Sequence, residues 1–385
     1  MIYLDNGATT YPKPQSVVNA VDFAMKNYSF NPGRGGYEAA GKVAEMIFEC
    51  RSKLGEMFGC PADRVVFTSN CTAALNICIK GLFKPGDHLI CSSLEHNAVM
   101  RPLNTLRKQG AVIDVAEVIF GDPDATARSF ERLIRPNTRG IICTHASNVI
   151  GTVLPVKAIG RICRERGILF IVDAAQTAGM LPINMEEMGI DYLCIAGHKG
   201  LYAPLSIGAL LCRGECPIPL IEGGTGNNSV MLTQPDELPE RLESGTLPVP
   251  LIAGLSAGVS FVNRRGRDKI YESELSLIRR SYRGLSGMPS VNLYAPEPKA
   301  GMCVPVLSFN IAGMNSGEVG EILARNGIAV RTGLHCAPTA HKHIGTLDIG
   351  TVRIVPSAFT KESDIDRLLS TVKNIDSRQK NARKY

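Results

Sequence analysis

The feature that most constrains this chain is the alternation of short apolar strands with amphipathic helical segments. Five apolar runs predict strands at Val65–Thr68, His88–Ser92, Gly140–Thr144, Ile168–Asp173 and Asp191–Ala196. The segments between them have helical spacing; in 156–165, for example, Ile159 and Ile162 share one face. This order predicts an α/β fold whose mainly parallel sheet is covered by helices on both faces. Residues 207–212 should add an antiparallel neighbour to the last strand.

The second half of the chain changes in texture. From 216 to 250, prolines, glycines and asparagines interrupt every period, which predicts a long loop region that serves function or an interface. A helix is expected at 251–263. Further on, the pattern predicts strand, helix, two strands and a last helix, at 304–311, 316–326, 328–331, 350–355 and 361–373. The basic residues that follow should form a solvated tail.

Length and pattern together suggest two domains, since a domain holds about 150 residues on average. We expect an N-terminal segment, 1–20, that packs on the small domain. Residues 21–262 would form the large domain, and 263–385 a smaller α+β domain.

Charge and cysteine content exclude several classes of protein. The 42 basic and 36 acidic side chains leave a net charge of +6, too dilute for a dedicated nucleic-acid partner. The 12 cysteines are scattered without a paired framework, which favours a reducing cytoplasm. Neither a leader pattern nor a membrane-spanning apolar run is present, so no membrane partner is expected. His341 and His343 lack the companions of a ligand set, and no metal site is predicted.

Two charged groups follow neighbouring predicted strands. Asp173 ends one apolar strand, and His198 and Lys199 lie in a glycine-flanked turn after the next. Alone, such an Asp is more often a helix cap or a salt-bridge partner, and most lysines are solvated. In open α/β sheets, however, ligands bind outside the carboxyl ends of the strands. A carboxylate for a pyridinium and a desolvated amine for a Schiff base are the two fixed points of a pyridoxal phosphate (PLP) site.

Three further polar residues are predicted at the same sheet edge. Thr72 lies at a helix start, where free N–H groups suit a phosphate. His96 follows a strand and is placed to stack on a planar ring. Asn148 follows another strand and is suited to bind a phenolate or carboxylate. Each has an ordinary structural explanation, so the prediction depends on their common position.

The segment VRTGLHCAP contains the best nucleophile candidate. Arg331 and His335 lie close to Cys336 in the sequence, and nearby cations favour a thiolate, although most of the cysteines must be inert. Arg353 lies on a predicted strand. It is either a salt-bridge partner or a bidentate clamp for a substrate carboxylate.

Taken in order, these segments closely resemble the cysteine desulfurases, which are class V, fold-type I PLP enzymes. The segments are YLDNGATT, FTSNCTAALN, LEHNAV, THASNVIGT, VDAAQTAG, AGHKG, ESGT, RTGLHCAP and GTVRI. The short RTGLHCAP loop is similar to that of group II members, which include selenocysteine lyases. The resemblance implies a large PLP-binding domain, a small C-terminal domain that carries the cysteine loop, and a homodimer.

The resemblance also implies roles around the cofactor ring. Lys199 would be the Schiff-base lysine and the general acid and base. Asp173 would pair with the pyridine nitrogen, Gln176 would donate to the ring oxygen, and His96 would stack on the ring. Asn148 would contact the cofactor as well as the substrate.

Phosphate and substrate carboxylate would have their own ligands. By the same resemblance, Thr72 and His198 would hold the phosphate, and Thr246 would reach it from the other subunit. Arg353, together with Asn148, would bind the carboxylate of the substrate.

The implied reaction converts L-cysteine to L-alanine and leaves a persulfide on Cys336 for an unidentified sulfur-acceptor protein. A selenocysteine lyase acting on L-selenocysteine is the alternative, followed by a class V aminotransferase or another β-lyase. A cofactor-free binding scaffold is the non-enzymatic alternative. The chain departs from common family residues at Ala73, Ala196 and Tyr37, which bear on substrate preference and the sulfur acceptor.

Overall fold

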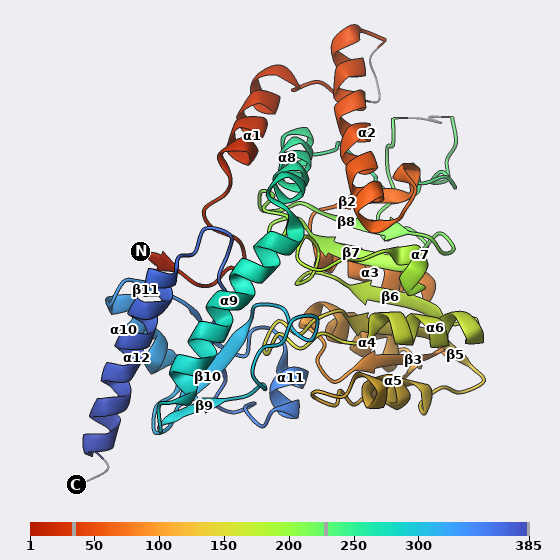
Figure 1. Ribbon diagram of the computed structural model, residues 1–385. Helices are drawn as coiled ribbons and strands as arrows, with labels where there is room; N and C mark the ends of the chain where they lie inside the picture. Colours follow the sequence, from red (N-terminus) through yellow and green to blue (C-terminus); the bar gives the residue numbers. More distant parts are fainter. Residues whose placement is uncertain (33–35, 227–229, 383–385) are drawn as a thin grey trace.

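The structure, a computed structural model, describes residues 1–32, 36–226 and 230–382. Its centre is a seven-stranded sheet of order β2-β8-β7-β6-β5-β3-β4 (Figure 1). The strands are β2 (Val65–Thr68), β3 (His88–Ser92), β4 (Val112–Ala116), β5 (Thr138–Thr144), β6 (Leu169–Asp173), β7 (Tyr192–Ala196) and β8 (Gly208–Cys212). Strands β3 to β7 are parallel, and β8 runs antiparallel to both of its neighbours. The predicted α/β class is therefore confirmed.

Helices cover both faces of this sheet because most of its strands are buried on both sides. On one face, α3 (Cys71–Leu82) and α4 (Asn97–Lys108) form a core cluster with one set of strand residues. The opposite face carries α2 (Glu38–Phe58), α5 (Pro123–Glu131), α6 (Val156–Arg166), α7 (Met185–Met188) and α8 (Val249–Arg265). Helix α1 (Gln15–Asn27) packs against α8.

Most predicted strands of the large sheet are present, but β4 was not predicted. This edge strand exposes Val112 and Val115 and carries Asp114, so it lacks the continuous apolar run of its neighbours. The antiparallel neighbour of β7 is present as β8. Strand β2 lies beyond β8, at the edge of the sheet.

The C-terminal third forms a four-stranded antiparallel sheet of order β12-β13-β10-β9. Its elements are α9 (Arg267–Ser286), β9 (Val291–Leu293), β10 (Leu307–Ile311), α10 (Ser316–Arg325), β11 (Ile328–Ala329), β12 (Arg331–Gly333), α11 (Pro338–His343), β13 (Thr351–Ile354) and α12 (Glu362–Ala382). The single strand predicted at 328–331 is two strands. The last helix continues to Ala382, so the expected tail is helical over most of its length.

The chain begins beside this smaller sheet. Strand β1 (Ile2–Tyr3) pairs in parallel with β11, and the N-terminus lies next to it (Figure 1). We propose a two-domain division with its boundary at Gly266, where the chain turns from α8 into α9, because residue 262 falls inside α8. Within the described residues, no helix has the length and apolar character that a bilayer span requires.

Candidate active site

Asp173 and Lys199 meet at the carboxyl edge of the large sheet. Asp173 ends β6, and Lys199 lies just past the end of the adjacent strand β7. The buried Asp173 accepts hydrogen bonds at Oδ1 from Ala175 N (2.9 Å) and Cys71 Sγ (3.4 Å). Burial lowers the pKa of Lys199 below its ordinary value, and the charge of Asp173 partly opposes this shift. The two predicted fixed points therefore lie at one edge of the sheet, Asp173 buried and Lys199 half-buried.

The turn that carries Lys199 is shaped by a close backbone approach. A Cβ on Gly200 would lie 2.4 Å from the carbonyl oxygen of Ala178, so only glycine fits there without a shift. From the start of the chain, the amide of Thr10 (3.0 Å) and the Lys13 Nζ (2.9 Å) both donate to the carbonyl of His198. These contacts fix the turn from two sides.

The imidazoles of His198 and His96 are held in the neutral form. Burial lowers the pKa of each to about 4. Within the described residues, the buried Nδ1 of His198 has no hydrogen-bond partner. His96 caps α4, since its Nδ1 accepts from Ala98 N (3.0 Å), which leaves the proton on Nε2.

Thr72 lies exposed in the first turn of α3, as predicted for a phosphate ligand. The preceding Asn70 caps this helix by accepting from Ala73 N (2.9 Å). The remaining free N–H groups and the hydroxyl of Thr72 are therefore available to an anion at this helix start.

The loop that carries Cys336 is fixed in an uncommon conformation. His335 and Cys336 have φ of 49° and 57°, in the left-handed region. Asn148 Nδ2 donates to the His335 carbonyl (2.8 Å), and Asn97 N donates to the Cys336 carbonyl (2.7 Å). The exposed Cys336 Sγ lies 3.7 Å from Arg331 Nη2. The predicted nucleophile is thus accessible and adjacent to a cation.

Arg353 lies beneath this loop on β13. Its Nη1 donates to the Asn148 carbonyl (2.9 Å), and its Nη2 donates to Asp5 Oδ1 (2.8 Å). Arg353 therefore forms the salt bridge expected of a structural arginine. It is also hydrogen-bonded to Asn148, the residue expected to bind the substrate carboxylate together with it. The sequence predicted no role for Asp5, which lies in the YLDNGATT segment, because nothing local links it to residue 353.

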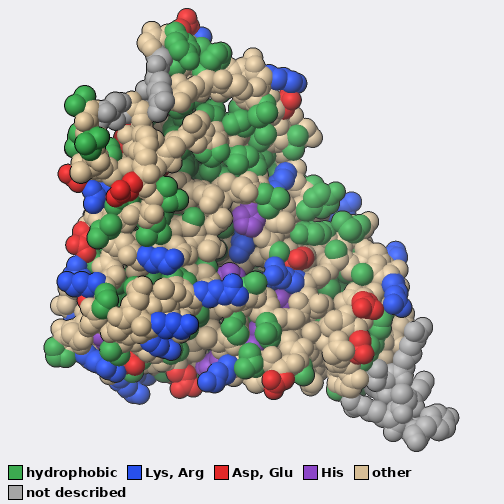
Figure 2. Space-filling view, turned by 180° about the vertical axis from the view of Figure 1, so that it is seen from behind, with side chains coloured by type: hydrophobic (Ala, Val, Ile, Leu, Met, Phe, Trp, Pro, Cys, Tyr) green, Lys and Arg blue, Asp and Glu red, His purple; other side chains and the backbone are tan. Residues whose placement is uncertain are grey.

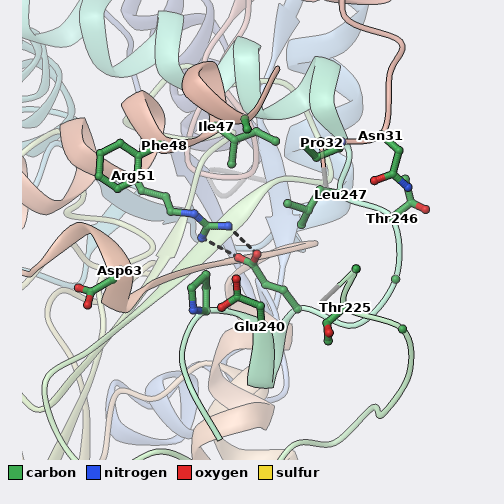
Figure 3. A pocket seen from close by; sticks show the side chains of 16 residues that line it. Asn31, Pro32, Ile47, Phe48, Arg51, Asp63, Thr225, Glu240, Thr246 and Leu247 are labelled. Carbon is green, nitrogen blue, oxygen red and sulfur yellow. Dashed lines mark hydrogen bonds and ion pairs between the residues drawn. The ribbon is translucent and has the colours of Figure 1, made fainter. Parts of the chain in front are cut away.

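The structure does not bring all predicted residues together. Gln176 lies near Lys199 and donates from Nε2 to the Gly7 carbonyl (3.1 Å). Thr246, by contrast, lies exposed on the wall of a separate cavity of about 660 Å³, which Lys199 does not line. Figure 3 shows this cavity, with the ion pair between Arg51 and Glu243 inside it.

The residues at the sheet edge fit PLP. A buried carboxylate, a lysine amine with a lowered pKa and an unpartnered buried imidazole nitrogen would each gain a partner from its ring nitrogen, aldehyde and phosphate. Among the described residues, no group of three or more His, Cys, Asp or Glu side chains is arranged to hold a metal ion.

Comparison with known proteins gives a consistent result. The aminotransferase class-V family matches residues 2–368. A probable cysteine desulfurase of Methanothermobacter thermautotrophicus is 33% identical, over 97% of this chain and 94% of the relative. One from Pyrococcus abyssi is 30% identical over the same shares.

Solved structures agree with these relatives. The apo cysteine desulfurase of Thermococcus onnurineus NA1 superposes with a TM-score of 0.89 at 30% identity, over 98% of this chain and 94% of the other. The Escherichia coli cysteine desulfurase CsdA gives 0.85 at 26% identity, over 97% and 94%. The resemblance drawn from the motifs is confirmed, and with it the fold type. By its sequence and by its fold, the chain belongs to the class-V aminotransferases, a family of PLP-dependent enzymes.

Proposed function

We propose that this protein is a PLP-dependent cysteine desulfurase, which converts L-cysteine to L-alanine and retains the sulfur on Cys336. The observation that carries the proposal is the link between Asn148, Arg353 and the cysteine loop. Asn148 donates to the His335 carbonyl and accepts from Arg353 through its own carbonyl. A substrate whose carboxylate binds Arg353 would therefore lie close to the thiol.

Eight residues are proposed to hold the cofactor: Thr72, His96, Asn148, Asp173, Gln176, His198 and Lys199 of one chain, and Thr246 of the second copy. Bound PLP supplies an electron sink that stabilises negative charge at the substrate Cα. Asp173 would keep the ring nitrogen protonated. Because burial lowers the pKa of Lys199, its amine is suited to take the Cα proton and return it.

Sulfur transfer would then fall to Cys336. Its thiolate, beside Arg331, attacks the substrate sulfur, and an S–S bond forms as the Cβ–S bond breaks. The electron pair of the broken bond stays with the carbon skeleton, which takes up a proton and leaves as alanine. The hydrogen bonds that fix residues 335 and 336 hold the nucleophile in position for this step.

The decisive experiment is incubation of the purified holoenzyme with L-cysteine. Mass spectrometry should find a persulfide on Cys336, with one alanine per sulfur transferred. The Cys336→Ala variant should form neither the persulfide nor alanine from L-cysteine. Pyruvate and ammonia in place of alanine would refute the proposal and indicate a different β-lyase. A Cys336→Ala variant that is inactive on cysteine but active on L-selenocysteine would assign selenium chemistry as well.

A homodimer is also part of the proposal, with Thr246 serving the cofactor phosphate of the second copy. Its exposure supports this, as do exposed apolar side chains on α1, α2 and the turn after β7: Val18, Phe23, Phe48 and Leu205. Figure 2 shows hydrophobic side chains gathered on the upper part of the surface, where α1, α2 and α8 lie.

Complementation between two inactive variants tests the shared site. Activity should return when inactive Lys199→Ala and Thr246→Ala chains are mixed, because one site of the hybrid dimer then has both residues intact. No recovery in a verified hybrid dimer would refute the exchange.

The acceptor of the persulfide is proposed to be another protein. The exposed position of Cys336 supports such a transfer. A cytoplasmic location remains a proposal that rests on the scattered free cysteines.

A further inference from the structure

The segment 5–13 crosses the candidate active site and contacts it at several points. Asp5 pairs with Arg353, the carbonyl of Gly7 accepts from Gln176, and Thr10 and Lys13 donate to the turn at His198. A Cβ on Gly7 would lie 3.3 Å from the Arg353 guanidinium carbon and 2.9 Å from a methyl of Val355. We name residues 5–13 the strap. The strap lies directly against the side chain of Arg353.

Arg353 has a defined set of partners in this position. Its side chain is 1% exposed, whereas that of Asp5 is 21% exposed. Nη1 and Nη2 each donate one hydrogen bond, to the Asn148 carbonyl and to Asp5 Oδ1. Within the described residues, the buried Nε has no partner. A buried guanidinium with an unused donor is ready for a second anion, but it already has one counter-ion.

We propose that Asp5 is a specificity-determining residue that limits how tightly Arg353 binds the substrate carboxylate. The inference rests on the proposed function, in which Arg353 receives that carboxylate. Asp5 neutralises the guanidinium and repels an incoming carboxylate in a region of low water content. Its hydrogen bond also orients the guanidinium. The result is a site that recognises a carboxylate and still releases alanine.

A purely structural role for the Asp5 side chain is the competing explanation. The strap, however, is attached by backbone contacts that do not need this carboxylate. Asp5 forms a bridge with Val355, the amide of Asn6 donates to the Val355 carbonyl, and Asn6 Nδ2 donates to it as well (2.9 Å). An Asp5→Asn variant keeps an oxygen acceptor for Arg353 and removes only the charge.

The test compares two ligands that differ only in the carboxylate. Binding of L-alanine and of ethylamine to the holoenzyme is followed through the absorption spectrum of the bound cofactor, which requires no turnover. In Asp5→Asn, the dissociation constant for L-alanine should fall roughly tenfold, because the repulsion between the Asp5 carboxylate and the carboxylate of L-alanine is lost. That for ethylamine should stay within about twofold. Asp22→Asn, an exposed carboxylate paired with Lys26 on α1, is the matched control and should change neither.

Two results would overturn the inference: equal changes for both ligands, or weaker binding of L-alanine alone. Either would assign Asp5 a structural or orienting role. If Asp5→Asn does not fold, Asp5→Ser supplies an uncharged acceptor at the same position with the same expected direction. A wild-type holoenzyme that binds neither ligand would instead refute the proposed function.

Discussion

Removing one partner of the buried ion pair between Arg51 and Glu243 should destabilise the protein strongly. The two side chains are 7% and 5% exposed, and they are joined by two contacts, of 2.6 Å and 2.8 Å. Arg51 also donates to the carbonyl of Val65, and Glu243 accepts from the amide of Phe67. The pair thus provides hydrogen-bond partners to the outer edge of β2, which has no neighbouring strand on that side among the described residues. Figure 3 shows the contacts of Arg51 as dashed lines.

The perturbation is Arg51→Met, which removes the cation and leaves Glu243 charged and buried. At an effective dielectric constant near 20, two unit charges about 4 Å apart attract by about 4 kcal/mol. Removing one partner of a buried pair typically costs 3–5 kcal/mol, roughly the same amount. We therefore expect the free energy of unfolding of the large sheet region to fall by about 4 kcal/mol.

Urea unfolding of Arg51→Met, Glu243→Leu and the double variant measures this coupling. The double variant should be less destabilised than the sum of the single variants, because it leaves no unpaired charge. Lys42→Met breaks the exposed pair with Glu38 on the same helix and should cost under about 0.5 kcal/mol. A cost near 1 kcal/mol for Arg51→Met, or full additivity in the double variant, would refute the reasoning.

Three further outcomes concern the lysine turn and its neighbours. Lys199→Ala should lose the absorption band of covalently held cofactor, checked by spectroscopy after dialysis; a retained band would contradict its role. Gly200→Ala should cost about 1–3 kcal/mol in thermal unfolding because its Cβ meets a carbonyl at 2.4 Å, whereas Gly287→Ala, with 3.8 Å of space, should be nearly neutral. In the cofactor-free protein, burial lowers the pKa of His96 and of His198 to about 4, so NMR titration of these two imidazoles should show no step near 6.5. A step there that vanishes on replacing either histidine by glutamine would argue against this assignment.

Most strands of the large sheet were predictable because they are buried on both faces and so form continuous apolar runs. The residues at their carboxyl ends follow from the same pattern, since parallel strands bring their ends to one edge. That is why the sequence alone predicts that Asp173 and Lys199 lie at the same edge. Edge strand β4 was not predicted because it is partly exposed and contains Asp114, so it lacks a continuous apolar run.

Contacts between distant parts of the chain had no local signal. Asp5 and Arg353 are separated by 348 positions, and no periodicity relates them. The same holds for Arg51 and Glu243, which come from a helix and a loop 192 positions apart. The break of 328–331 into β11 and β12 depends on a partner, β1, at the other end of the chain. Such features are set by tertiary packing and not by propensity.

The strap also has a consequence for how the protein matures on the ribosome. Asp5 of the strap and its partner Arg353 on β13 are separated by 348 positions. Translation proceeds at roughly 5–20 residues per second, so Asp5 waits many seconds until Arg353 has been synthesised. The contact between the strap and Arg353 therefore forms only after the strands and helices of the large domain have emerged.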